Sequence, residues 1–283
     1  MSESRIGRAI LTVSAGNGGQ KRQERALGFL EEYLRRRFAP VRIYRSFSDR
    51  RTVREYRRNG LPADTVQEAL ERIRTDGYLR VAVQPALITG GEEYETIMEE
   101  IRTRVGYGCF TSIACGKPLL AEREDCASCA RALTAALSGC GEERTGFGET
   151  DSGEKKSGGR IILLPGRRAG PKAMDLYRTL RAELRDRGSE NLYPVAENDK
   201  VGMEEFLSGL PEAGGNIFLQ PFSFEADGEE EGIFSGKNRP GSSFPWKPGF
   251  EVEHSLAGLG EYDEICRLFG DRLEELLPEI RVE

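Results

Sequence analysis

The stretch VAVQPALITGGEE, residues 81–93, decides the fold because residues 217–230, IFLQPFSFEADGEE, repeat its plan. Each stretch has a short apolar run, then Gln-Pro, then a second apolar segment and finally Gly-Glu-Glu. Continuous apolar runs of this length are typical of strands that are buried on both faces. Two such stretches, about half a chain apart, predict that the chain contains a duplicated unit.

The repeat extends outward from these two stretches. In the first half, the pattern predicts strands at 8–16, 41–47 and 79–85. It also predicts three helices: one at 20–38, one that begins after a capping box at Thr65–Glu68, and one at 91–105. After residue 159 the order starts again, with strands at 160–168, 191–197 and 216–222 and a helix at 171–188. Both halves therefore follow the same order of strands and helices.

Strands that alternate with helices are typical of mainly parallel sheets flanked by helices. We expect an α/β fold of two similar domains, an N-terminal half at 1–140 and a C-terminal half at 160–283. Residues 141–159 are polar, glycine-rich and without periodicity, which predicts a linker or a long surface loop. Because open α/β sheets bind ligands beyond the carboxyl ends of their strands, we expect one cleft lined from both halves.

The composition excludes several classes of protein. The chain has 283 residues and a net charge of −6, which argues against a general binder of nucleic acids or acidic membranes. The N-terminus lacks the apolar core of a signal peptide, and no apolar run approaches the length of a membrane span. We therefore expect a cytoplasmic protein with reduced thiols, and the sequence leaves open a homo-oligomer.

Five of the six cysteines lie between residues 109 and 140, and two of them form a Cys126-x-x-Cys129 motif. One interpretation is a metal–thiolate site. The other, which we favour because no second Cys pair is evident, is that these thiols serve as small apolar side chains. The single histidine, His254, shares a strand face with Phe250 and Val252, which indicates a structural role.

Polar residues gather just beyond the predicted strand ends. Carboxylates placed there can bind a divalent cation or accept protons, and guanidinium groups suit the bidentate capture of carboxylates or phosphates. For Glu229, Glu230 and Glu231, a solvated surface run is the alternative. The candidates are Ser14, Gly16, Glu92, Glu93, Arg167, Arg168, Glu197, Asp199, Asp227, Glu229 and Glu230.

A series of segments, in order along the chain, resembles the anaerobic sirohydrochlorin cobaltochelatases of the class II chelatase superfamily. The series includes AILTVSAG, YRSFSDRRTVREYRRNG, ADTVQEALERIRTDGYLRVAVQPALITGGEEYE, GKPLLAEREDC, FLQPFSFEADGEE and SSFPWKPGFEVEHSLAGLGE. The resemblance implies two α/β domains around a cleft that takes a tetrapyrrole. It also implies insertion of Co²⁺, the substrate metal, into sirohydrochlorin on the anaerobic cobalamin route, with no organic cofactor.

The resemblance assigns roles to particular residues. It implies that Glu197 binds the metal, and that Glu229 stands where the family has a histidine. Two other family histidines are matched by the region near Gly166 and by Leu87, neither of which supplies an imidazole. We expect Glu197 and Glu229 to be the catalytic and metal-binding residues. The expected substrate-binding residues are Ser14, Gly16, Arg167, Arg168 and Trp246.

Three interpretations follow from this departure. The first is an active cobaltochelatase in which carboxylates replace the imidazoles. The second is a catalytically degenerate relative that binds a tetrapyrrole or a metal without inserting it. The third places the metal at the cysteines. Residues 228–250, which contain Trp246, are either a lid whose aromatic rings stack on a macrocycle or a long surface loop.

Overall fold

The computed structural model describes residues 7–16, 19–106, 108–138, 160–226 and 249–277. Its strands form two four-stranded parallel sheets. The first has the order β2 (Arg42–Phe47), β1 (Gly7–Ser14), β3 (Tyr78–Pro85), β4 (Ser112–Cys115). The second has the order β6 (Leu192–Ala196), β5 (Ile161–Gly166), β7 (Gly215–Leu219), β8 (Phe250–His254). The identical orders confirm the expected α/β fold with an internal duplication.

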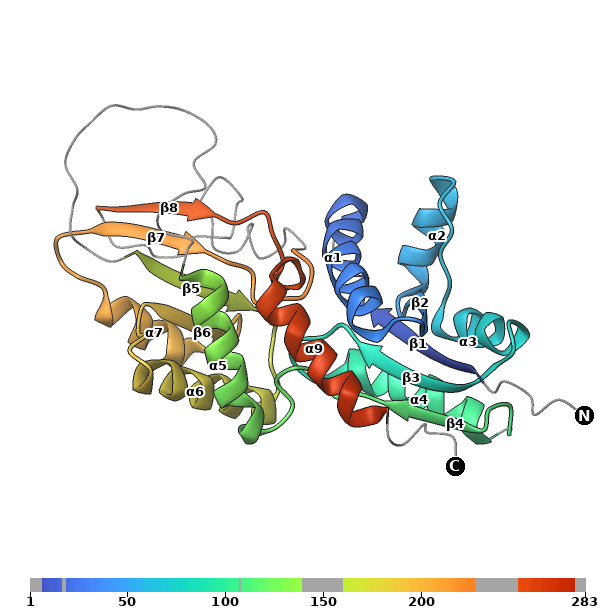
Figure 1. The fold of residues 1–283 in the computed structure, drawn as a ribbon. Coiled ribbons are helices and arrows are strands. Elements are labelled where there is room, and N and C mark those ends of the chain that lie inside the picture. The colour runs from blue at the N-terminus through green and yellow to red at the C-terminus, as the bar shows by residue number, and fades with distance from the viewer. Residues whose placement is uncertain (1–6, 17–18, 107, 139–159, 227–248, 278–283) are drawn as a thin grey trace, which may run out of the picture.

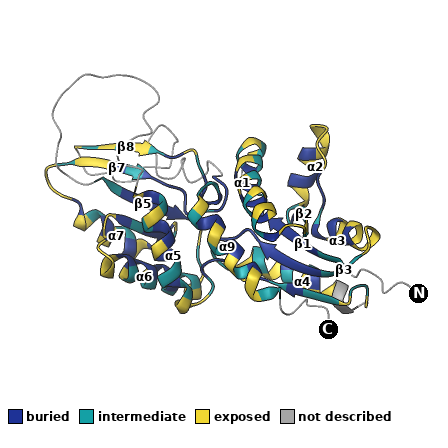
Figure 2. Cartoon of the chain, in the orientation of Figure 1, coloured by how far each residue is buried: buried dark blue, intermediate teal, exposed yellow. Residues whose placement is uncertain are grey.

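Helices cover both faces of the first sheet. Alternate residues of β1 and β3 point to opposite faces, so that Ile10 and Ala82 pack with one group of helices while Leu11 and Val83 pack with another. The first group is α1 (Gln20–Phe38) and α9 (Asp263–Leu276), and the second is α3 (Val66–Thr75) and α4 (Glu92–Gly106). Burial on both faces explains why these strands are continuously apolar (Figure 2).

The second sheet is covered in the same way. Helices α5 (Arg123–Leu137) and α6 (Pro171–Asp186) pack with Ile162 and Leu164, whereas α7 (Lys200–Gly209) packs with Leu163 and Val195 on the other face. Helix α5 precedes β5 in the chain yet lies beside α6, and α9 comes last yet lies against α1 (Figure 1). The two halves therefore share one continuous core.

The repeated Gln-Pro segments do the same work in each half. The Nε2 of Gln84, at the end of β3, donates to the carbonyl of Lys117 at 3.3 Å, just past β4. The Nε2 of Gln220, just past β7, donates to the carbonyl of Ala257 at 2.8 Å, just past β8. Both amides are fully buried, and a buried amide needs such partners. The repeat thus fastens the third strand of each sheet to the loop after the fourth.

The local predictions are largely confirmed. The Thr65 capping box is present, with the Glu68 carboxylate accepting from the Thr65 N–H at 2.8 Å. Sequence reasoning did not identify α2 (Arg50–Arg58), whose buried side chains are only Thr52, Val53 and Tyr56. The predicted linker at 141–159 lies outside the described residues. In the described part of the chain, no helix is both long and apolar enough to span a membrane.

Candidate functional site

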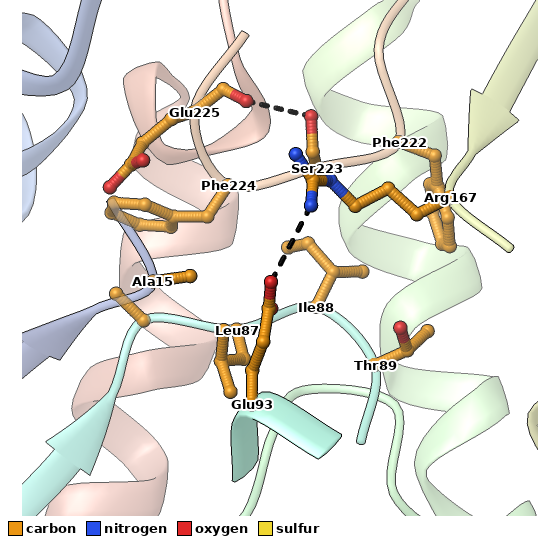
Figure 3. Close-up of a pocket in the computed structure, with 11 residues that line it drawn as sticks. Ala15, Leu87, Ile88, Thr89, Glu93, Arg167, Phe222, Ser223, Phe224 and Glu225 are labelled. Atoms are coloured by element: carbon orange, nitrogen blue, oxygen red, sulfur yellow. Dashed lines mark hydrogen bonds and ion pairs between the residues drawn. The ribbon is translucent and has the colours of Figure 1, made fainter. Parts of the chain in front are cut away.

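A pocket lies where the two halves meet at the carboxyl ends of their strands (Figure 3). Loops that follow β1, β3, β5 and β7 all contribute to it, as the fold rule for open α/β sheets predicts. Its lining residues are Ala15, Ala86, Leu87, Ile88, Thr89, Glu93, Arg167, Phe222, Ser223, Phe224 and Glu225. The sequence predicted a cleft lined from both halves, and this pocket confirms it.

An ion pair crosses the pocket. Glu93 reaches up from the first turn of α4, and its Oε1 lies 3.5 Å from the Nη1 of Arg167, in the loop after β5 (Figure 3). Both side chains are 42% exposed. An ion pair with this exposure contributes little to stability. A carboxylate on a ligand can therefore take the place of Glu93 at small cost.

Two carboxylates of the C-terminal half are placed differently from each other. Glu197 follows β6 and is exposed, and its side chain makes no hydrogen bond or ion pair with the residues that the structure describes. Asp199, by contrast, is buried; it accepts from Gly202 N at the start of α7 and pairs with Arg181 at 3.1 Å. Asp199 was a candidate for the cleft, but its contacts are those of a helix cap and a buried ion pair.

The loops that carry Arg167, Arg168 and Glu197 are tied together. The N–H of Glu197 donates to the carbonyl of Gly166 at 2.9 Å. The side-chain amide of Asn198 both accepts from the N–H and donates to the carbonyl of Ala169, at 2.8 and 3.0 Å. Exposed basic and acidic side chains are thereby held on two neighbouring loops at one edge of the sheet.

The loop after β1 is fixed by Gly16 and Ser14. Gly16 has a φ of +81°, and a Cβ there would lie 2.6 Å from the Oγ1 of Thr52. That hydroxyl donates to the Gly16 carbonyl at 2.8 Å, so only glycine fits this turn. Ser14 is fully buried, accepts from Gly16 N at 2.9 Å, and donates its hydroxyl to Glu225 of the other half.

Comparison with known proteins finds similarity to chelatases in sequence and in fold. A family model described as "Cobalt chelatase (CbiK)" matches residues 8–145. A sirohydrochlorin cobaltochelatase of Salmonella typhimurium is 31% identical over 127 residues, which is 44% of this chain and 47% of that protein. Sirohydrochlorin cobaltochelatase CbiKC of Nitratidesulfovibrio vulgaris is 30% identical over 130 residues, 45% of each. The matches thus span about half the length of these relatives.

The structural similarity extends further along the chain. The sirohydrochlorin chelatase SirB from Bacillus subtilis subspecies spizizenii, solved in complex with cobalt, covers 95% of this chain and 94% of its own. The TM-score is 0.61 at 18% identity, which shows the common fold. The N-terminal half of the chain thus matches the cobalt chelatase family model, and the whole described chain has the fold of a chelatase.

The chelatase fold shows where the expected residues lie. Leu87 lines the pocket and packs in the apolar cluster around α3 and α4. Glu229, Glu230, Asp227 and Trp246 lie outside the described residues, as does most of the proposed lid. In the rest of the chain, the described residues contain no group of three His, Cys, Asp or Glu side chains that could hold a metal ion.

Of the five cysteines in the described residues, Cys126, Cys129 and Cys266 are buried, and Cys109 and Cys115 are partly exposed. Burial raises the pKa of the thiols of Cys115, Cys129 and Cys266 to about 12, and that of Cys126 to about 11. Cys126 and Cys129 point to backbone carbonyls of Leu176 and Leu119. A metal–thiolate site requires accessible thiolates, so these contacts favour the apolar interpretation. His254 ends β8, where it shares a half-buried face with Phe250 and Val252, as the sequence predicts.

Sequence reasoning missed Glu225 altogether. It lies four residues before Glu229, and its side chain is brought to Ser14 from 211 positions away along the chain. The repeated Gly-Glu-Glu motif drew attention to Glu229, whereas the fold places Glu225 in the pocket.

Proposed function

We propose that this chelatase inserts Co²⁺ into sirohydrochlorin. The observation that carries the proposal is the pocket of Figure 3, in which loops from both halves of a chelatase fold place charged side chains at one cleft. The named activities of the two curated relatives supply the substrate and the metal. The cytoplasmic location and a homo-oligomeric state remain predictions.

The reaction asks three things of the protein. It must deliver a divalent metal, accept the protons that leave the pyrrole nitrogens, and hold a macrocycle that carries many carboxylates. In our proposal Glu197 and Glu229 bind the metal, Arg167 and Arg168 pair with substrate carboxylates, and Trp246 stacks on the macrocycle. Ser14 and Gly16 shape the facing wall. The exposed Glu197 suits capture of a cation from solvent.

The test is an anaerobic mixture of the purified chain, sirohydrochlorin and Co²⁺, followed by absorbance against a protein-free control. We expect faster insertion than in the control, and in Glu197→Ala a KM for Co²⁺ raised by at least about tenfold, as the loss of one ligand predicts. Cys126→Ala is the matched control and should behave as the wild-type chain. Loss of cobalt binding in Cys126→Ala, with Glu197→Ala intact, would move the metal site to the cysteines.

A second candidate function is favoured by Leu87, a buried apolar side chain where the family resemblance expects an imidazole. In this alternative the chain binds a tetrapyrrole without inserting the metal. A shift of the tetrapyrrole spectrum on addition of protein, with no acceleration of insertion, would favour it.

A further inference from the structure

Glu225 is a buried carboxylate on the wall of the pocket. Its residue is 5% exposed and lines the pocket beside Ala15, Phe222 and Phe224 (Figure 3). Its carboxylate accepts a hydrogen bond from the hydroxyl of Ser14, which itself is fully buried. This hydrogen bond joins the end of β1 to the loop after β7, and therefore one half of the chain to the other.

The backbone around Glu225 is held rigidly. The Ser223 hydroxyl donates to the Glu225 carbonyl at 2.7 Å, and the N–H of Gly260 donates to the Phe224 carbonyl at 2.9 Å. A Cβ on Gly258 would lie 2.7 Å from the Glu225 Cα. The loop that contains Gly258 therefore packs directly against the backbone of Glu225, at a distance that only glycine allows. A side chain on such a support has the fixed position that catalysis requires.

The carboxylate of Glu225 affects the pKa of the neighbouring Tyr56 phenol. Burial raises the pKa of Tyr56, and the carboxylates of Glu24 and Glu225 raise it further. The Tyr56 side chain comes from α2 and is 2% exposed. Glu225 is itself 5% exposed, so its carboxylate is largely shielded from bulk water, in contrast to the exposed Glu197.

Sheet order separates these two carboxylates. Glu197 follows β6 and Glu225 lies beyond β7, and these strands flank β5 on opposite sides. Arg167, which follows β5, stands between the two loops. The site therefore offers an exposed carboxylate on one side and a buried one, fixed by Ser14, on the other.

We propose that Glu225 is the catalytic base that takes a pyrrole proton during metal insertion, and that Ser14 positions it; this rests on the proposed function. When the pyrrole N–H bond breaks, its electron pair stays on nitrogen and forms the bond to the metal, while the proton forms an O–H bond on Glu225. Insertion of a divalent metal releases two protons. Glu225 takes one and later yields it to water, and water takes the other directly.

The experiment compares wild-type chain with Glu225→Gln in the anaerobic insertion assay. Glutamine keeps the length of the side chain and an oxygen that accepts from Ser14, but it takes no proton. Because a positioned base contributes about 10²–10⁴-fold, we expect kcat to fall by at least about 100-fold. The KM values for Co²⁺ and sirohydrochlorin and the Tm should stay close to those of the wild-type chain.

Two further variants separate a base from a structural contact. In Glu225→Ala, added formate should restore part of kcat, because a small carboxylate can enter the space that the side chain leaves. In Ser14→Ala, kcat should fall less than in Glu225→Gln, because the base is present but no longer oriented. Glu212→Gln, an exposed residue between α7 and β7 at the far edge of the sheet, is the matched control and should leave both constants unchanged.

The outcomes are distinct. If the wild-type chain accelerates insertion and Glu225→Gln does so equally well, Glu225 is not the base and the proposed function stands. If Glu225→Gln loses kcat and tetrapyrrole binding together, and formate restores nothing in Glu225→Ala, the residue is a structural contact. If the wild-type chain gives no acceleration, the proposed function fails, and the role of Glu225 fails with it.

Discussion

Replacement of Phe269 by alanine tests whether the two halves fold as one unit. Phe269 lies on α9, is fully buried, and packs edge-to-face on Phe224 with ring centroids 5.4 Å apart. Truncation of a buried Phe to Ala costs about 3–5 kcal/mol, and loss of the aromatic pair places this site in the upper part of that range. At about 2–4 °C per kcal/mol for a large domain, Phe269→Ala should lower Tm by roughly 10–15 °C.

Because α1, α5, α6 and α9 share one core, the variant should still unfold in a single transition, measured by circular dichroism and by intrinsic fluorescence. Its kcat should also fall, since Phe224 adjoins Glu225. Arg267→Ala on the same helix is the control. Its side chain is exposed, and surface substitutions usually change stability by less than about 0.5 kcal/mol, so Tm should change by less than about 2 °C. Two separate transitions, or a loss of stability below about 1 kcal/mol for Phe269→Ala, would contradict a shared core.

Two other substitutions test buried groups away from the pocket. Arg181→Met should lower the free energy of unfolding, measured in urea, by about 3–5 kcal/mol, because it leaves the Asp199 carboxylate buried without its cation. The double variant Arg181→Met/Asp199→Asn keeps the cap of α7 and should recover most of that loss. No recovery would contradict the explanation. In Cys109→Ser/Cys140→Ser, the four remaining thiols have pKa values raised to about 11–12 by burial, so on the order of 10⁻³ or less is thiolate at pH 8. Alkylation by iodoacetamide should therefore be far slower in the native variant than in the urea-unfolded variant, and it should accelerate as the pH rises toward 10. Equal rates in the native and unfolded states would refute the assignment of these cysteines as buried side chains.

The elements that the sequence predicted well are those whose periodicity is strong. Continuous apolar runs located β1, β3 and β5, and the Thr65–Glu68 pattern located the start of α3, because burial on both faces and capping are local properties. Helix α2 was not predicted because a helix of nine residues with three buried side chains has only a weak apolar periodicity. Asp199 was misplaced for a different reason: a carboxylate after a strand can face a cleft or cap the next helix, and only the contact with Gly202 decides.

The packing partners of α5 and α9 could not be predicted from the sequence. An amphipathic helix shows that one face must be buried, but not which sheet or helix will bury it. Helix α9 packs against α1, at the other end of the chain, and α5 packs against α6. Glu225 was not predicted as a site residue for the same reason, since only the folded chain brings it to Ser14.

The two halves have one scaffold but different chemistry. Matching backbone hydrogen bonds, Ala86 N to Val13 O and Phe222 N to Pro165 O, make the loops after β1 and β5 equivalent, and likewise those after β3 and β7. Arg167 then corresponds to Ala15, and Glu225 corresponds to Thr89.

The same comparison extends to the metal side of the site. The bonds from Ser48 N to Ser14 O and from Glu197 N to Gly166 O make Glu197 the counterpart of Ser48. Three charged residues of the C-terminal half thus correspond in position to small or hydroxyl-bearing residues of the N-terminal half. The family model matches 8–145, which contains the less charged set. The segments that resemblance predicts to carry two of the replaced histidines lie after that range. The half of the chain beyond the match to the family model is therefore also the half in which the resemblance puts Glu229 at the position of a histidine. Glu225→Gln tests whether a different carboxylate of that half accepts the proton.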